Sequence, residues 1–197
     1  MRQTELTRKT RETDITLRLG VPDPGNAPSG DLHIATGVPF FDHMLTAMLF
    51  HGGFSADITA AGDTDVDDHH TVEDVGIVLG TAFRRIVDEH GPIQRFGHGI
   101  VPMDDALAEV VIDAGGRSFL SYRAAFPQER AGRFDLSLVR EFFQGLSAQA
   151  HANVHVIGHY ADNGHHLAEA IFKAAGRALK TAYHPAGETV QSTKGIM

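Results

Sequence analysis

Two short runs of the sequence combine the side chain types that bind divalent metal ions. They are copies of the pattern His-His-x-x-Glu, made of His69, His70 and Glu73 in the first copy and His165, His166 and Glu169 in the second. Imidazole nitrogen is a frequent ligand of transition metals, and a carboxylate oxygen favours harder ions such as Mn(II) or Fe(II). Two copies of one chelating pattern therefore indicate a metal-dependent chemistry.

Helical geometry would place the three side chains of each copy on one face. Each residue turns the helix by about 100°. With His69 at zero, the angle around the helix axis is about 100° for His70 and about 40° for Glu73. The carboxylate would then sit between the two imidazoles. A single His pair at a helix start is usually a surface feature, and a following Glu is an ordinary preference for helix N-termini. The recurrence of the whole pattern favours the metal site.

Two bound ions would need more than these six ligands. The chain has 13 His, against no Trp and 3 Tyr. His43 and His155 are the further candidates, the latter alternating with Val154 and Val156 on a predicted strand. The remaining histidines are predicted to be structural or superficial: His33, His51, His90, His98, His151, His159 and His184.

Periodicity and helix-breaking residues predict the elements that must position these side chains. Helices are expected over 39–51, 69–90, 136–150 and 165–182, and strands over 15–19, 32–36, 54–59, 107–113, 118–124 and 153–159. Gly115-Gly116 lies between two of these strands and predicts a hairpin. The element order is β-β-α-β-α, repeated once.

The repeat extends beyond the metal motif and predicts a duplicated fold. The shared pattern is H-H-x-x-E-x₆-G-x-A at a constant offset of 96 residues, and Phe40-Phe41 and Phe142-Phe143 open the preceding helices similarly. The expected fold class is α+β, with mixed sheets and helices packed on one face. We expect one domain over 1–197, made of halves of about 1–92 and 93–184 and a tail over 185–197.

Composition excludes several functions. A formal net charge of −8 argues against nucleic acid or an anionic membrane as a partner. The chain has no Cys, so neither disulfides nor thiolate ligands are available. No signal peptide or apolar membrane span is evident, and a cytoplasmic protein is expected.

With these residues in place, the sequence resembles the imidazoleglycerol-phosphate dehydratase family of histidine biosynthesis, in its monofunctional form. The likeness runs through nearly the whole chain, in segments 8–13, 39–44, 68–74, 94–97, 102–104, 113–117, 140–143, 164–173 and 192–195. It is weaker around Ala114-Gly115-Gly116, at Ser118 and at Ala47, where other residues are frequent in the family. These departures concern the substrate loop and leave the metal motifs intact.

The resemblance implies a fold, a metal centre and an assembly. The fold would be of the ribosomal protein S5 domain 2-like type. Two Mn(II) ions per active site would lie between subunits of a homo-oligomer of 24 chains. Carried over by position, the metal ligands are His43, His69, His70, Glu73, His155, His165, His166 and Glu169. The phosphate anchors are Arg95, Arg117, Ser192 and Lys194, and the acids that approach the glycerol portion are Glu12 and Asp104 or Asp105.

The implied reaction removes water from imidazole glycerol phosphate to give imidazole acetol phosphate. A metal ion on an imidazole nitrogen would make the ring an electron sink, so an imidazolate-like intermediate is a hypothesis. Glu169 is the first candidate for proton transfer, before Glu73 and Glu12. Two other functions stay open: a metal-dependent hydrolase, and an assembly protein whose metals only join subunits.

Overall fold

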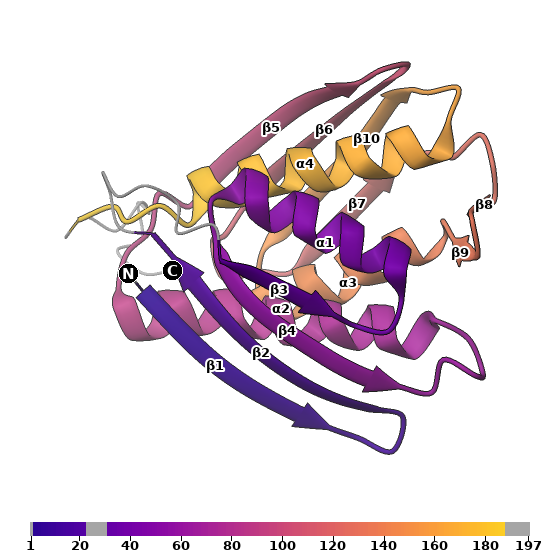
Figure 1. The fold of residues 1–197 in the computed structure, drawn as a ribbon. Helices are drawn as coiled ribbons and strands as arrows, with labels where there is room; N and C mark the ends of the chain where they lie inside the picture. The colour runs from indigo at the N-terminus through magenta and orange to yellow at the C-terminus, as the bar shows by residue number, and fades with distance from the viewer. Residues whose placement is uncertain (1, 23–30, 188–197) are drawn as a thin grey trace.

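The computed structural model describes residues 2–22 and 31–187, which form two four-stranded sheets with four helices between them (Figure 1). The first sheet has the order β1 (Arg2–Lys9), β2 (Thr13–Val21), β4 (Ser55–Gly62) and β3 (Leu32–Ala35). The second has the order β5 (Phe96–Met103), β6 (Ala106–Asp113), β10 (Asn153–Tyr160) and β7 (Phe119–Arg123). The helices are α1 (Pro39–Gly52), α2 (His69–His90), α3 (Leu138–Ala150) and α4 (Gly164–Ala182).

The two sheets repeat one topology, which confirms the α+β fold class and the duplication. In the first sheet β2 pairs antiparallel with β1 and β4, and β3 pairs parallel with β4. In the second sheet β6 pairs antiparallel with β5 and β10, and β7 pairs parallel with β10. A short hairpin of β8 (Arg130–Ala131) and β9 (Phe134–Asp135) is added in the second half before α3. Within the described residues, no helix combines the length and apolar character needed to cross a membrane.

Each four-stranded sheet has one strand more than predicted, so apart from the β8–β9 hairpin each half has the order β-β-β-α-β-α. The missed strands, β1 and β5, show little apolar alternation in their sequences. Strand β1 is mostly polar, and β5 contains two Gly and one Pro. The predicted hairpin across Gly115-Gly116 is wrong, because β10 lies between β6 and β7. A turn signal reports only local chain reversal, so it cannot show that a later strand inserts between two neighbours.

The core lies between the sheets, against the helices. In β2 the side chains of Ile15, Leu17 and Leu19 are fully buried, while Thr16 and Arg18 face outward. Burying each aliphatic side chain of this size contributes about 1.5–3 kcal/mol. The helices pack across the halves: α1 contacts α4, and α2 contacts α3. The duplication is therefore interlocked, with each half supplying one helix to each pair.

The glycine of the repeated pattern is what lets these helix pairs approach closely. A Cβ at Gly176 would lie 2.0 Å from the carbonyl oxygen of Met48, and a Cβ at Gly80 would lie 2.5 Å from that of Leu146. Met48 and Leu146 are 98 residues apart, which gives the structural offset between α1 and α3. The Phe40-Phe41 and Phe142-Phe143 pairs are 102 residues apart, so their alignment is wrong by about one helical turn.

Candidate metal centre

Both His-His pairs lie in the first turn of a helix. Helix α2 begins at His69, as predicted, and the carboxylate of Asp67 accepts a hydrogen bond from the His69 amide at 2.8 Å. Helix α4 begins at Gly164, where the side chain of Asn163 accepts from the amides of His165 and His166. Asn163 thus caps α4, whereas Asp67 satisfies the first free amide of α2 from the residue before its cap position, and both bonds stabilise the helix starts that carry the imidazoles.

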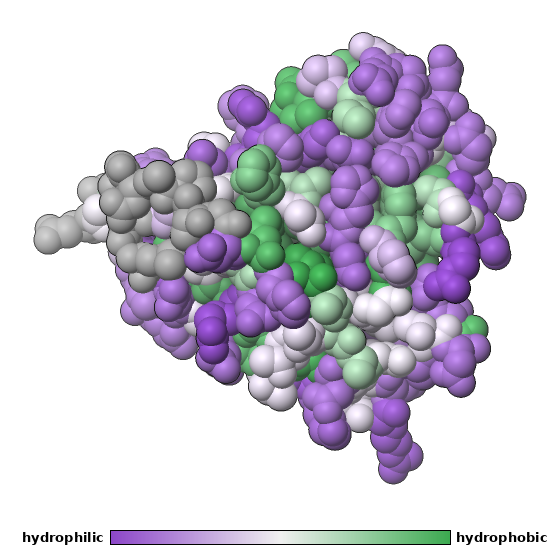
Figure 2. All heavy atoms as spheres, in the orientation of Figure 1, coloured by the Kyte–Doolittle hydropathy of each residue, from purple (hydrophilic) through white to green (hydrophobic). Residues whose placement is uncertain are grey.

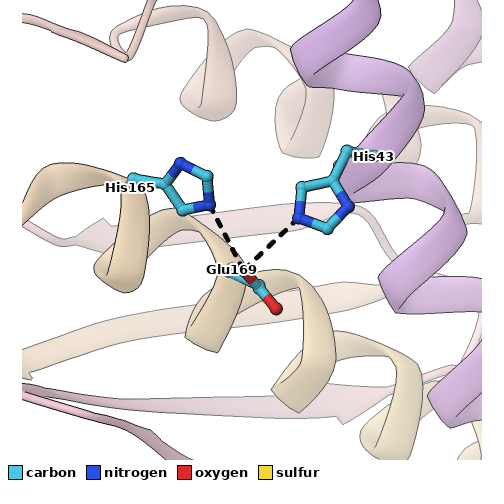
Figure 3. Close-up of side chains that lie close together, drawn as sticks. All are labelled: His43, His165 and Glu169. Atoms are coloured by element: carbon cyan, nitrogen blue, oxygen red, sulfur yellow. Dashed lines mark hydrogen bonds and ion pairs between the residues drawn. The ribbon is translucent and has the colours of Figure 1, made fainter.

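Three predicted ligands meet at one point, and they come from both halves. Within the described residues, His43 of α1 and His165 and Glu169 of α4 form the one group whose ligand atoms all lie within 4.8 Å of one another (Figure 3). Glu169 Oε2 lies 3.4 Å from His43 Nε2 and 3.3 Å from His165 Nε2. Ligands at about 2.1 Å from one ion are about 3–3.5 Å apart. The three donors thus fit a divalent cation.

Glu169 is ionised and oriented by a residue that the sequence argument missed. Lys173, one turn further along α4, donates to Glu169 Oε1 at 2.7 Å. Burial raises the pKa of Glu169, but hydrogen bonds and charge from Lys173 and His43 outweigh it, and the net pKa is lowered. The i, i+4 spacing of Glu169 and Lys173 on one helix could have identified this pair.

The second histidine of each motif turns away from its own glutamate. His70 Nδ1 lies 3.0 Å from Asp63 Oδ2, and His166 Nδ1 lies 2.5 Å from Asp105 Oδ1. These hydrogen bonds are the leading cause that raises the pKa of each imidazole. The expectation that each carboxylate sits between its two imidazoles does not match this structure, because an angle of about 100° on the helix points the imidazoles at different neighbours.

Four predicted acids take different positions around these histidines. Glu12, at the β1–β2 turn, lies 3.9 Å from His70 Nε2, and Asp104, at the β5–β6 turn, lies 3.6 Å from His166 Nε2. Glu73 lies 3.5 Å from His69 Nε2. Asp105 also accepts from the amides of Asp162 and Asn163, and the bond from His166 leads the causes that lower its pKa to about 2.

The first motif lacks a counterpart of His43. At the structural offset of 98 residues, Glu141 of α3 occupies the position equivalent to His43, and its carboxylate pairs with Arg140 at 3.0 Å. His69 and Glu73 therefore have no imidazole facing them from α3. The duplication repeats the motif, but in the described part of the chain only the second copy gains a third candidate ligand from the other half.

His155 and the two described phosphate anchors, Arg95 and Arg117, lie away from the cluster of His43, His165 and Glu169. His155 is on the outer face of the second sheet, because Val154 and Val156 face the helices. The Arg95 amide bonds to the carbonyl of Ala182, at the last turn of α4. His165 is in the first turn of that helix, about 25 Å away at a rise of 1.5 Å per residue.

Both arginines lie away from the cluster, and the other two anchors fall outside the described residues. Arg95 makes two hydrogen bonds to Asp113, at 2.6 and 3.1 Å, which lead the causes that raise its pKa. The carbonyl of Arg117 accepts from Asn153, at the start of β10. Ser192 and Lys194 are not among the described residues.

Two pockets flank the β8–β9 hairpin near the motifs. One, of about 380 Å³, includes Phe40, Asp68, Arg133 and His165 in its lining. The other, of about 450 Å³, includes Asp68, His69 and Arg133. Burial raises the pKa of Asp68, and the charge of Arg133 opposes that shift. Arg133 thus lines both the pocket that contains His165 and the pocket that contains His69.

The fold and this site define a duplicated α+β protein with a histidine–carboxylate cluster suited to a divalent cation. The sequence profile of the imidazoleglycerol-phosphate dehydratase family matches residues 36–179. The chain belongs to this family of hydro-lyases, which serves histidine biosynthesis.

Individual relatives agree along the full length. The imidazoleglycerol-phosphate dehydratases of Bacillus pumilus and Aromatoleum aromaticum are each 48% identical to this chain, with complete coverage of both sequences. The crystal structure of the Staphylococcus aureus enzyme is 37% identical with a TM-score of 0.82, over 93% of this chain and 99% of that one. The Pyrococcus furiosus enzyme, solved in complex with (S)-C348, is 37% identical with a TM-score of 0.84, over 98% and 100%.

Proposed function

We propose that this chain removes water from D-erythro-imidazole glycerol phosphate to give imidazole acetol phosphate, at Mn(II) sites shared between copies of the chain. The observation that carries this proposal is the cluster of His43, His165 and Glu169, in a chain that belongs to the dehydratase family. Two imidazoles and one carboxylate suit Mn(II) or Fe(II), and a family of dehydratases supplies the reaction. Two ions per active site and a cytoplasmic location remain predictions.

The separation of the predicted residues supports an active site built from several copies. His165 and Arg95 are at opposite ends of α4, too far apart for one small substrate to bridge them within one chain. His155 faces away from the helices that hold the cluster. If the carried-over ligands and anchors act together, one copy must supply the cluster and another the imidazole of His155 and the arginines.

Exposed apolar surface is consistent with a homo-oligomer, for which we propose 24 subunits. The outer face of the second sheet presents Phe96, Ile100, Val111 and Phe119, with exposures of 37–56%. On the first sheet the outward positions of β1 and β2 are polar instead. In Figure 2, hydrophobic side chains also gather over the central band where α1 and α4 lie in Figure 1. Burial of such surface is the main driving force of association.

The chemistry expected of the chain's own residues follows from their positions. A bound cation would stabilise negative charge that develops on the substrate's imidazole. Glu169, kept ionised beside Lys173, is the first candidate to accept the carbon-bound proton, before Glu73 and Glu12. Glu12 and Asp104 lie on exposed turns, where they could approach the substrate. Asp105 is an exception among the predicted acids, because His166 and two backbone amides already occupy its carboxylate.

Direct turnover tests the proposal. Metal-stripped protein would be given imidazole glycerol phosphate with and without Mn(II), and imidazole acetol phosphate would be measured. We expect product only with metal and only from the assembled oligomer, sized by light scattering. Release of inorganic phosphate instead of the acetol product would favour a hydrolase. Bound Mn(II) in an intact assembly without any product would favour a structural role for the metal.

The place of Glu169 in proton transfer has its own test. Replacement by Gln keeps the side chain's shape and one carbonyl oxygen but removes its basicity. We expect Glu169→Gln to lower kcat by at least about 100-fold, the usual scale of general acid–base catalysis. Full metal content together with undiminished turnover would exclude Glu169 from this step.

A further inference from the structure

Two carboxylates outside the predicted ligand set hold the second histidine of each motif in the same way. Asp63 lies with its two oxygens 3.0 and 3.2 Å from His70 Nδ1, and Asp105 lies with Oδ1 2.5 Å from His166 Nδ1. Both histidines are partly buried beside these partners. In each case Nδ1 is occupied, and Nε2 is the ring nitrogen left facing the acid of a hairpin turn.

The chemistry of this contact fixes the tautomer of the imidazole. An ionised carboxylate can only accept hydrogen bonds, so Nδ1 must carry the proton. In the neutral ring, Nε2 then presents its lone pair, which is the form that binds a metal. A carboxylate behind a metal-binding histidine also holds the ring plane in position and raises its basicity.

We infer that Asp63 and Asp105 are positioning residues, which present Nε2 of His70 and His166 to a divalent cation. This inference rests on the proposed metal-dependent function. It also changes the role of Asp105, which was expected to approach the substrate. Neither carboxylate need touch the substrate or the ion, because each acts through the imidazole that it holds.

The origin of the two carboxylates supports a shared requirement. Asp63 directly follows β4 in the first half, whereas Asp105 lies in the β5–β6 turn of the second. These positions are not equivalent in the duplicated topology, where β4 corresponds to β10 and the β5–β6 turn to the β1–β2 turn. Copying of one ancestral half therefore does not account for the two contacts. The same arrangement is reached from two different loops.

Asp63 offers the cleaner experiment of the two. In the described part of the chain its carboxylate bonds to His70 alone. Asp105 uses its second oxygen to hold the amides of Asp162 and Asn163, and Asn163 caps α4. Loss of Asp105 would therefore disturb the helix that bears His165 and Glu169, as well as His166 itself.

The test is the affinity of the full-length oligomer for Mn(II) alone, measured by competition with a chelator. We expect Asp63→Ala to weaken binding at the affected site by tenfold or more, the usual effect of losing such a partner. Asp63→Asn should stay within about threefold of wild type, because its amide oxygen still accepts from Nδ1–H. The matched control is Asp57→Ala, which removes a carboxylate 3.0 Å from His33 Nδ1 on the outer face of the first sheet and should change nothing.

The outcomes are separable. Wild-type affinity in Asp63→Ala would overturn the inference, and so would an Asn variant as weak as the Ala variant, which would point to a need for charge. A wild-type oligomer that binds no Mn(II) would instead remove the proposed metal function on which the inference rests. If the Asp63→Ala variant does not assemble, Asp63→Ser replaces it. The serine side chain is about one bond shorter than that of Asp, so its hydroxyl does not reach Nδ1 of His70. The visible spectrum of bound Co(II), altered in the weak variant and restored in Asp63→Asn, gives a second readout of ligand geometry.

Discussion

His43 Nε2 and Glu169 Oε2 lie 3.4 Å apart, although 126 residues separate them in the chain. His43 belongs to α1 in the first half, and Glu169 belongs to α4 in the second. The contact depends on close packing of the two helices, and Gly176 permits that packing beside the backbone of Met48. The metal cluster is therefore a product of how the two halves interlock.

This dependence predicts the effect of a side chain at the helix crossing. Gly176→Ala should lower the free energy of unfolding by about 1–3 kcal/mol through overpacking, even though Ala gains about 1 kcal/mol in helix propensity. It should also weaken Mn(II) binding, because α1 and α4 must move apart. Denaturant unfolding and chelator competition measure the two effects. Arg177→Ala, an exposed neighbour on the same helix, should leave both near wild type.

The cluster also predicts which histidines matter for the metal. His43→Ala removes one of the three donors of the cluster and should weaken Mn(II) binding by at least about tenfold. Loss of a residue that only holds a metal ligand in place already weakens metal affinity by about this factor. His33→Ala removes an exposed histidine on the outer face of the first sheet and should have no effect. Equal Mn(II) dissociation constants for both variants and wild type would show that the ion binds elsewhere.

The start of α3 predicts a pH-dependent contribution to stability. Asp135 Oδ1 accepts from the amide and hydroxyl of Ser137, at 2.9 and 2.7 Å, and these bonds lower the pKa of Asp135 below 3.8. A lowered pKa in the folded state means that the unfolded chain binds more protons. The stabilisation is therefore complete well above pH 3.8 and is lost as the pH falls through the folded-state value.

Unfolding of Asp135→Ala across pH checks this prediction. At pH 7 the variant should be less stable than wild type by about 0.5–2 kcal/mol, the range for losing a side-chain bond at a helix start. The gap should narrow below pH 4, as the wild-type carboxylate becomes protonated. A gap that stays constant into acid would mean that the carboxylate's charge plays no part. Asp65→Ala, at an exposed position, is the control.

A buried hydroxyl predicts a stabilising substitution. The ring of Tyr183 packs against Phe83 with centroids 4.5 Å apart, and its hydroxyl has no hydrogen-bond partner among the described residues. Burial raises the pKa of this phenol. Because an unpaired buried hydroxyl costs free energy, Tyr183→Phe should raise the unfolding free energy by about 1 kcal/mol. Tyr160→Phe, whose side chain is 63% exposed, should change it by less than about 0.5 kcal/mol.

Much of the fold followed from local sequence signals. The helix over 69–90 has the predicted bounds, and the starts of α1 and α4 lie within one residue of prediction, because Pro39 and the Asp-Asn-Gly turn mark them. The missed strands of the two large sheets, β1 and β5, have weak apolar alternation, and β8 and β9 are only two residues each. The wrong hairpin arose where a strand distant in sequence, β10, inserts beside β6. Local signals describe short segments, whereas strand order depends on pairing between distant segments.

The site divides in the same way. The metal motifs and their duplication could be predicted from residue types and spacing, since residues at positions i, i+3 and i+4 share one face of a helix. The sequence by itself thus determined the family, the donor types and the helices that bear them. Only the tertiary structure decided that His43 joins the second motif, while Glu141 stands in its place beside the first. It also decided that Arg95 lies far from His165, and that Asp63 and Asp105 each hold a histidine. The physical reason is that these contacts join residues distant in the chain, which meet only when the helices and sheets pack.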